Sequence, residues 1–365
     1  MNRKYLVAVG VVALVLAALV FIFRGQNGFN LPPGPSGSPS PAPIAAPTPS
    51  PIPVHEVYVA NMGDHSILGF AIDDRGHVAA TPTRVIQGPS TGLHNPFDVV
   101  TDSAERIYVA NLGDPPGNGS SVTVYSSTAN GNAQPIRTLG VRREPMPTLT
   151  KATSVTIRPR PEGVLVADQP PEPTPGGGQI MEFSTTVGQD DPIRVIRSGD
   201  AAELNTIAGI ALDQSQRILV VDTMRPRILI YPDTQMLGII RPPIEAIIEG
   251  AATGLNNPID AALDSTGNIF VVNRGSLNSS VRDASITVYA PGARGDAAPI
   301  RVIGSFGSPG ANLVDPVGIA LDASNRIFLL QGGSLKIFEA GVTGDPRPVQ
   351  VISAAINNPG GLSVR

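Results

Sequence analysis

Two aspartates stand at the same place in a five-residue run that recurs along the chain. Asp98 begins the run Asp-Val-Val-Thr-Asp, and Asp260 begins the run Asp-Ala-Ala-Leu-Asp. Three matching positions carry glycine instead: Gly209, Gly318 and Gly361. Carboxylate oxygens are ligands that hard cations such as Ca²⁺ prefer, and two close carboxylates raise one another's pKa. We therefore weigh two roles for Asp98 and Asp260: a divalent-cation site completed by water, or two carboxylates that are solvated or hydrogen-bonded locally.

A second set of polar residues ends another recurring run, of which Val57-Tyr-Val-Ala-Asn61 is the first copy. The six copies end at Asn61, Asn111, Asp168, Asp222, Asn273 and Gln331. Asn and Asp side chains start turns by bonding to nearby backbone groups, and a polar residue in every copy favours that structural role. A ligand-contacting role is the alternative, for which we name Asn61, Asn111 and Asn273.

Histidine and cysteine usage restricts the chemistry further. The four histidines are His55, His65, His77 and His94, all near the beginning of the repeats. A histidine-rich metal site drawn from several repeats is therefore not expected, and only His94, in a predicted loop, is placed to contact a ligand. The chain has no cysteine, which excludes disulfides and thiolate sites, and it has no Gly-x-Ser-x-Gly nucleophile motif.

The elements that position these residues come from an internal repeat with a period of roughly fifty residues, as in β-propellers. Its marker is Pro-Ile-Arg-Val-Ile or a close variant, and the copies begin at Pro82, Pro135, Pro192, Pro243, Pro299 and Pro348. Each repeat holds four short apolar runs, typical of a four-stranded blade whose outer edge strand begins at the proline. Another strand ends in an aromatic residue in every copy, and we expect these side chains to pack between blades: Phe70, Tyr125, Phe183, Tyr231, Tyr289 and Phe338.

The repeat count predicts a six-bladed propeller that the C-terminus closes. The first repeat lacks the inner strand, and the final segment Asn358-Pro-Gly-Gly-Leu-Ser-Val-Arg365 matches Asn95-Pro-Phe-Asp-Val-Val-Thr-Asp102. We therefore expect the last residues to supply the inner strand of the first blade, which removes an exposed sheet edge. Asp98 and Asp260 then lie three blades apart, on opposite sides of the central channel. We expect ligands on the face that carries the long loops entering the inner strands.

Copies such as VGIALDASNRIFLL and FDVVTDSAERIYVAN resemble NHL-type repeats, and the resemblance covers about residues 55–365. It implies a six-bladed propeller of the wider superfamily that includes regucalcin/gluconolactonase-like lactonases, lyase-type domains and non-catalytic binding modules. The lactonase-like metal site uses Asn or Asp at the starts of inner strands. The matching residues here are of other types: Phe97, Thr153, Ala208, Ile259, Val317 and Gly360. The resemblance therefore implies the fold and argues against lactonase activity.

The N-terminus predicts a membrane anchor. Tyr5 to Phe23 are 19 residues without a charge, or roughly 28 Å as a helix, which matches the hydrocarbon thickness of a bilayer. Arg3 and Lys4 precede this segment, so we expect a cytoplasmic N-terminus and an extracytoplasmic propeller. Cleavage as a signal peptide, giving a secreted protein, is the alternative. We divide the chain into the transmembrane anchor 1–24, a Pro/Ser/Gly-rich disordered linker 25–53, and the propeller 54–365.

Charge and composition complete the functional expectation. The net charge of −4 gives no basic footprint for nucleic acid. We expect a membrane-tethered module whose top face binds a protein, peptide or glycan, and a binding protein rather than an enzyme. The alternative is a metal-dependent hydrolase, lactonase-like or lyase enzyme with its site in the central channel. We expect no cofactor, apart from Ca²⁺ or another divalent cation at the two aspartates.

Overall fold

The computed structural model describes residues 55–113, 119–141, 148–169, 177–186, 188–197, 204, 206–276, 283–304 and 310–365. The predicted anchor and linker lie outside these residues. Within the described ranges, no helix has both the length and the apolar character needed to span a bilayer.

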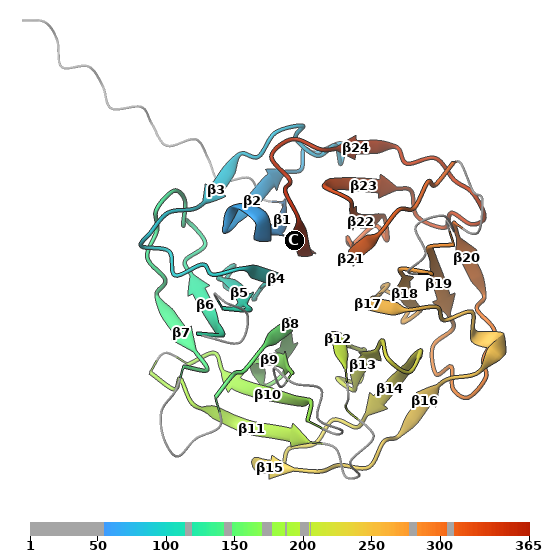
Figure 1. Cartoon of the computed structure of the whole chain (residues 1–365), viewed down its shortest axis with the longest axis horizontal. Coiled ribbons are helices and arrows are strands. Elements are labelled where there is room, and N and C mark those ends of the chain that lie inside the picture. Colours follow the sequence, from blue (N-terminus) through green and yellow to red (C-terminus); the bar gives the residue numbers. More distant parts are fainter. Residues whose placement is uncertain are drawn as a thin grey trace, which may run out of the picture. The chain divides into compact units, whose positions relative to one another are not determined.

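The described residues form six β-sheets arranged as blades around a central axis (Figure 1). Blade one contains β25 (Pro359–Val364), β1 (Glu56–Asn61), β2 (Ser66–Ala71) and β3 (Arg84–Ile86). Blade two contains β4 (Pro96–Thr101), β5 (Ile107–Asn111), β6 (Ser121–Tyr125) and β7 (Arg137–Leu139). Blade three contains β8 (Ala152–Pro159), β9 (Glu162–Asp168), β10 (Gln179–Ser184), β11 (Pro192–Arg197) and β15 (Gly238–Ile240).

The other three blades follow the same order from the axis outward. Blade four contains β12 (Ile207–Leu212), β13 (Ile218–Asp222), β14 (Arg227–Tyr231) and β16 (Ala246–Ile248). Blade five contains β17 (Pro258–Leu263), β18 (Ile269–Asn273), β19 (Ser285–Tyr289) and β20 (Arg301–Ile303). Blade six contains β21 (Pro316–Leu321), β22 (Ile327–Gln331), β23 (Ser334–Phe338) and β24 (Gln350–Ile352). Two short 3₁₀ helices, η1 (Met62–Asp64) and η2 (Ala251–Thr253), lie in connections.

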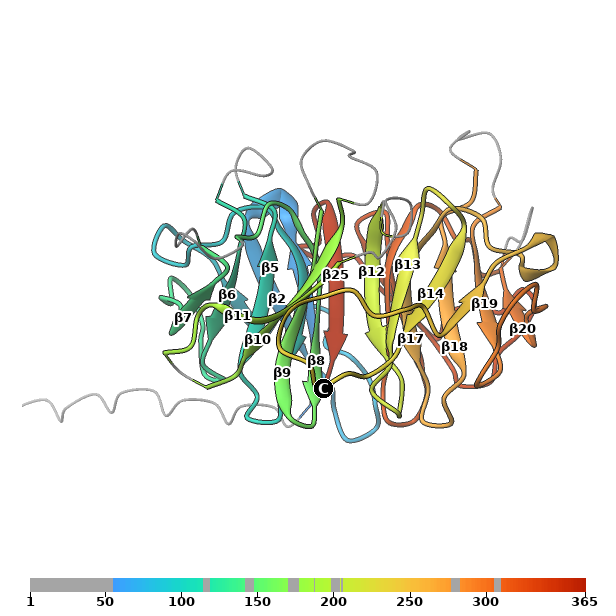
Figure 2. The same ribbon diagram turned by 90° about the horizontal axis from the view of Figure 1, so that it is seen from below.

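The C-terminal strand closes the ring, which confirms the six-bladed prediction. β25 pairs antiparallel with β1, with Val57 opposite Val364 and Val59 opposite Leu362. The last strand of the chain therefore lies beside the first, and the side view shows β25 in the middle of the ring (Figure 2). Because the pairing joins the two chain ends within one sheet, β1 is paired on both sides, with β2 and with β25.

The hydrophobic core is divided into six clusters, each made by two neighbouring blades. One of them joins blade six to blade one, with Leu362 packed beside Val57, Val59 and Phe328. The six repeated aromatic side chains are completely buried, as predicted: Phe70, Tyr125, Phe183, Tyr231, Tyr289 and Phe338. Since every blade shares its apolar faces with both neighbours, the strands are apolar on both sides.

Blade three differs from the predicted four strands, because β15 adds a fifth at its outer edge. This strand belongs to the connection that leaves β14 of blade four, and it pairs parallel with β11. Other blades show the same contact as single parallel bridges, such as Ile86 with Gly131 and Ile303 with Gly344. In each of these cases the connection that leads to the outer strand of one blade runs along the outer strand of the preceding blade. In blade three this contact is long enough to form a fifth strand.

Candidate functional site

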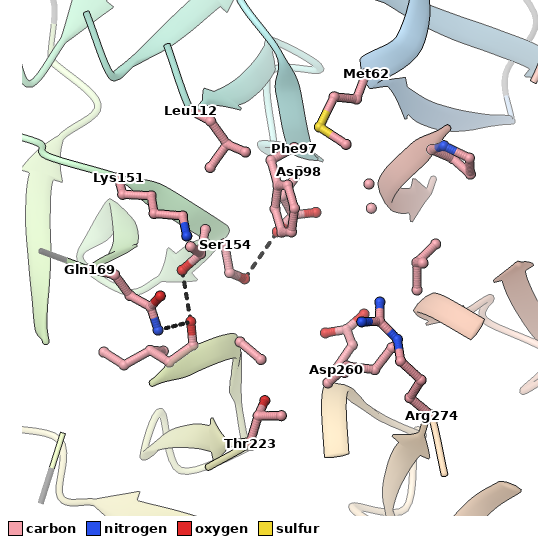
Figure 3. A pocket seen from close by; sticks show the side chains of 18 of the residues that line it. Met62, Phe97, Asp98, Leu112, Lys151, Ser154, Gln169, Thr223, Asp260 and Arg274 are labelled. Carbon is pink, nitrogen blue, oxygen red and sulfur yellow. Dashed lines mark hydrogen bonds between the residues drawn. The ribbon is translucent and has the colours of Figure 1, made fainter. Parts of the chain in front are cut away.

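A cavity of about 440 Å³ opens on the axis, at the end of the ring where the inner strands begin. Its size lies in the range of small-molecule sites. Its walls are formed by Met62, Phe97, Asp98, Leu112, Lys151, Thr153, Ser154, Gln169, Thr206, Ile207, Ala208, Thr223, Ile259, Asp260, Arg274, Asp315, Val317, Asn358, Pro359, Gly360 and Gly361. Figure 3 shows how side chains from different blades surround this space, among them Met62, Asp98, Ser154, Thr223 and Asp260.

The middle of the cavity wall is built by a β-bulge repeated in the inner strands. Each inner strand shifts its pairing register near its beginning: in β4 the shift falls between Pro96 and Asp98, and in β17 between Pro258 and Asp260. A bulge leaves one residue unpaired and redirects its side chain. The residues at these shifts are Phe97, Thr153, Ala208, Ile259 and Val317, joined by Gly360 of β25. Four of the six are apolar, and together they form what we call the bulge ring.

Asp98 lies on the floor of the cavity, one residue beyond the bulge ring. Its carboxylate accepts hydrogen bonds from the backbone N–H of Val155 at 2.9 Å and from the Ser154 hydroxyl at 3.0 Å. It also accepts the N–H of Val99 at 2.8 Å. The Ser154 oxygen in turn accepts the N–H of Ile210 at 3.2 Å. These bonds link blades two, three and four around the axis.

Asp260 occupies the equivalent place three blades away. Its carboxylate accepts the backbone N–H of Ile319 at 2.9 Å, in blade six, and that of Ala261 at 2.8 Å. A Cβ at Gly209 would lie 2.8 Å from this carboxylate, and one at Gly361 would collide with that of Asp98. Gly209 in blade four therefore leaves room for Asp260 of blade five, and Gly361 in blade one leaves room for Asp98 of blade two.

The environment of the floor disfavours the charged form of both aspartates. Burial raises the pKa of Asp98 to about 6, against the N–H and hydroxyl donors that favour ionisation. Burial also raises the pKa of Asp260 to about 8, and the charge of Asp98 adds to the effect. Both side chains are half-buried. The surrounding protein therefore replaces much of the water that would solvate a charged carboxylate, and this loss of solvation raises the pKa.

The stability of the propeller is therefore expected to fall as the pH rises from about 4 to about 8. An unfolded Asp loses its proton near pH 3.8, whereas the folded protein retains these protons to about 6 and about 8. Over this window the folded state binds more protons, so the free energy of unfolding decreases with rising pH. Urea midpoints at pH 5 and pH 8 measure the decrease. Asp98→Asn/Asp260→Asn should reduce it, and an equal decrease in both proteins would contradict the raised pKa values.

The mouth of the cavity carries the opposite charge. Lys151 precedes β8, and Arg274 follows β18; both side chains point towards the axis (Figure 3). The Nε atom of Arg274 lies 2.9 Å from Oδ1 of Asp315, an exposed carboxylate at the same rim. Among the described residues, the Lys151 ammonium makes no hydrogen bond or ion pair. The mouth thus presents two cations, of which one is paired.

The other predicted contact residues lie outside the cavity wall. Asn111 and Asn273 are fully buried at the ends of their strands. Their amide oxygens accept the N–H of His94 and of Asn256, and their NH₂ groups donate to Thr123 and Thr287. Asn61 is also buried, and its oxygen accepts the N–H of Asn357 at 2.6 Å. In each case the amide fastens the loop that leads into the inner strand of its own blade.

His94 is exposed and belongs to one of these loops. Its backbone N–H donates to Asn111 and its carbonyl accepts the N–H of Gly113 at 3.1 Å. The structure therefore brings together Asp98 and Asp260 of the predicted site residues, and it places His94 and the three asparagines around them as supports of the loops.

The floor offers few ligands to a divalent cation. Across the described residues, no group of three or more His, Asp or Glu side chains converges to hold a metal ion. Ca²⁺ takes six to eight oxygen ligands, and the floor offers two carboxylates that already accept backbone N–H groups. The bulge ring adds no carboxylate or imidazole. These residues do not fit a metal centre built by the protein.

Sequence reasoning missed the mouth cations and the bulge ring as parts of one site. The six ring positions attracted notice only because they are not metal ligands, and nothing in the sequence marks a bulge. Lys151 and Arg274 adjoin long loops, where spacing gives no direction for a side chain. The sequence signal that could have identified them is their position in the repeat. Lys151 lies directly before the inner strand of its blade, and Arg274 lies directly after the second strand of its blade.

Comparison with known proteins gives the fold alone. No protein-family model matches the chain, and no curated protein matches it. Among solved structures, a Bacteroides caccae protein of unknown function has a TM-score of 0.57 at 9% identity, covering 85% of this chain and 98% of its own. The periplasmic gluconolactonase of Pseudomonas aeruginosa has a TM-score of 0.54 at 11% identity, covering 85% and 98%. A Lactobacillus plantarum protein has 0.54 at 10% identity, covering 85% and 99%.

Proposed function

We propose that this protein is a non-catalytic binding module, held outside the membrane by its N-terminal segment, whose axial cavity receives one end of a peptide or protein ligand. The observation that carries the proposal is the cavity itself. Four apolar members of the bulge ring line its middle, and the charged groups of its wall lie at the mouth and the floor. Mostly apolar walls with a few placed polar groups are typical of binding sites.

The polar groups of the cavity support binding better than catalysis. Ser154 is its hydroxyl nearest to a carboxylate, yet that oxygen also accepts the N–H of Ile210 and so belongs to the links between blades. A serine nucleophile needs a base that is itself oriented by a third group. Among the described residues of the cavity wall there is no histidine to act as that base.

Apolar walls also favour a peptide over a glycan. Sugars are bound by many hydrogen-bonding groups and by stacking on aromatic rings, whereas Phe97 is the one aromatic side chain of the described wall. The hydroxyl of Thr153 and the amide of Gln169 both donate to the carbonyl of Ile207, at 2.9 and 3.0 Å. These two polar groups are thus already used inside the protein.

Filling the cavity tests the proposal. Ala208→Trp places a large side chain in the bulge ring, and Ala104→Trp, on an exposed turn at the other end of blade two, is the matched control. We expect tripeptides retained by the wild type to lose at least tenfold in affinity in Ala208→Trp and to keep their affinity in Ala104→Trp. The full chain, purified in mild detergent, is used for affinity selection with mass spectrometry.

Two results would contradict the proposal. Ligand retention that survives Ala208→Trp would place binding elsewhere on the molecule. Divalent-cation-dependent hydrolysis of lactones, abolished by Asp98→Asn/Asp260→Asn, would favour the enzymatic alternative that the shared fold with a gluconolactonase raises. Selective retention of oligosaccharides would replace the peptide by a glycan.

A further inference from the structure

The geometry points to a peptide that enters the axial cavity with its amino end first, so that its ammonium group lies between Asp98 and Asp260 and its carboxylate lies near Lys151. This inference rests on the proposed function and specifies the ligand end and its direction. It follows from the way charge changes along the depth of the cavity, which three independent features of the wall establish.

The first feature is the floor, where two carboxylates have no cationic partner among the described residues. Neither Asp98 nor Asp260 forms an ion pair with any described Lys, Arg or His. A carboxylate offers about four acceptor sites; Asp98 uses three of them and Asp260 two. Charges inside proteins are ordinarily paired. An ammonium group, which has three donors and one positive charge, matches both the free acceptor sites and the charge.

The second feature is the mouth, where positive charge exceeds negative charge. Arg274 is bound to Asp315 through Nε, and within the described part of the chain its two terminal nitrogens make no hydrogen bond. Lys151 is unpaired there as well, and its side chain points towards Ser154 in the view of Figure 3. A carboxylate of the ligand would find the unpaired ammonium of Lys151 at this level.

The third feature is the distance between the two charged layers. Lys151 lies directly before β8, and Ser154 lies in β8 three residues further on, so the two backbone positions are at most roughly 10 Å apart at the rise of a β-strand. A tripeptide in extended conformation spans about the same length. The bulge ring lies between the layers, where Phe97, Ile259 and Val317 can pack against the central side chain of such a peptide.

The alternatives satisfy only part of this arrangement. A simple amine would neutralise the floor and leave Lys151 unpaired, and a simple carboxylic acid would do the reverse. A peptide that entered with its carboxyl end first would bring its carboxylate against Asp98 and Asp260 and its ammonium against Lys151. Like charges at both ends would then oppose binding.

Four tripeptide pools of equal composition test the inference: free ends, N-acetylated, C-amidated, and blocked at both ends. They are presented together to the full chain in mild detergent, and retained peptides are counted by mass spectrometry. We expect the free-ended pool to be enriched at least tenfold over each blocked pool. In Asp98→Asn/Asp260→Asn the free and acetylated pools should become equal, and in Lys151→Met the free and amidated pools should become equal.

Matched variants control for net charge, since Asp74→Asn and Arg241→Met change exposed residues outside the cavity wall. These variants should keep the wild-type order of the pools. Preference for acetylated or fully blocked peptides, or no retention of any pool, would overturn the inference. Equal retention of all four pools that Ala208→Trp abolishes would also overturn it and would leave the proposed binding function standing. Equal retention that survives Ala208→Trp would overturn both.

Discussion

Removal of residues 360–365 is expected to abolish cooperative unfolding of the propeller. These residues make up nearly all of β25, which supplies the inner strand of blade one and places Leu362 in the cluster that joins blades one and six. Their loss would expose Val57 and Val59, which are fully buried, and would open the ring. We expect a loss of more than about 5 kcal/mol, comparable with the whole stability of an ordinary domain.

Circular dichroism and urea denaturation measure this effect, and removal of Arg365 alone is the control. Arg365 contributes one backbone hydrogen bond to Glu56 at 3.0 Å, a contact of its carbonyl with His55, and an ion pair with Glu105 at 3.3 Å. It adds nothing to the apolar cluster, so its removal should cost no more than about 1–2 kcal/mol. A six-residue deletion that unfolds at the wild-type midpoint would refute ring closure by β25.

The second large effect is expected from Glu182→Gln in blade three. The Glu182 carboxylate lies between two buried guanidinium groups: Arg158 Nε is 3.0 Å from Oε1 and Arg194 Nε is 2.7 Å from Oε2. Arg158 is completely buried and also binds Asp233, in the connection that forms β15. Removing the negative charge leaves the buried Arg194 guanidinium without its carboxylate partner and Arg158 with Asp233 alone, so we expect a loss of about 3–5 kcal/mol in the free energy of unfolding.

Glu162→Gln in the same blade is the matched control. Glu162 lies at the surface, 3.7 Å from Nη2 of Arg106, and its side chain is 26% exposed against 2% for Glu182. A partly exposed ion pair of this kind contributes about 1 kcal/mol or less. Similar urea midpoints for the two variants would show that the buried cluster does not stabilise blade three as the distances indicate.

The parts of the fold that repeat could be predicted from the sequence. The Pro-Ile-Arg-Val-Ile marker fixed the number of blades, and the match between the C-terminal segment and Asn95–Asp102 identified the strand that closes the ring. The repeated aromatic residues were correctly expected to be buried. Each of these features depends on a pattern that six copies reinforce, so no single residue had to be interpreted alone.

Features that occur once, or that depend on pairing, could not be predicted in this way. The sequence around β15 carries no repeat marker, and its partner β11 belongs to another blade. The bulges are shifts of register between two strands, and register is a property of the pair. The ligand-contacting role considered for Asn61, Asn111 and Asn273 could not be judged from the sequence either. Their side-chain amides bond to loops that only the folded structure brings next to them.

The candidate site combines residues that the repeat identifies with features that depend on strand pairing and loops. Asp98 and Asp260 were found from the repeat because they replace glycine, and their place near the axis follows from the propeller geometry. The depth of the site, with apolar residues above the aspartates and cations above those, required the bulges and the loops. The charge change that gives the cavity a direction was therefore visible only in the structure.

A crystal structure of the protein with the best-retained tripeptide tests the central claim most directly. We predict the peptide in the axial cavity, with its amino group between Asp98 and Asp260, its central side chain against the bulge ring and its carboxylate beside Lys151. A peptide bound in the reverse direction would contradict the inferred entry of the amino end. A peptide bound on the outer strands or on the opposite face would contradict the assignment of the axial cavity as the binding site.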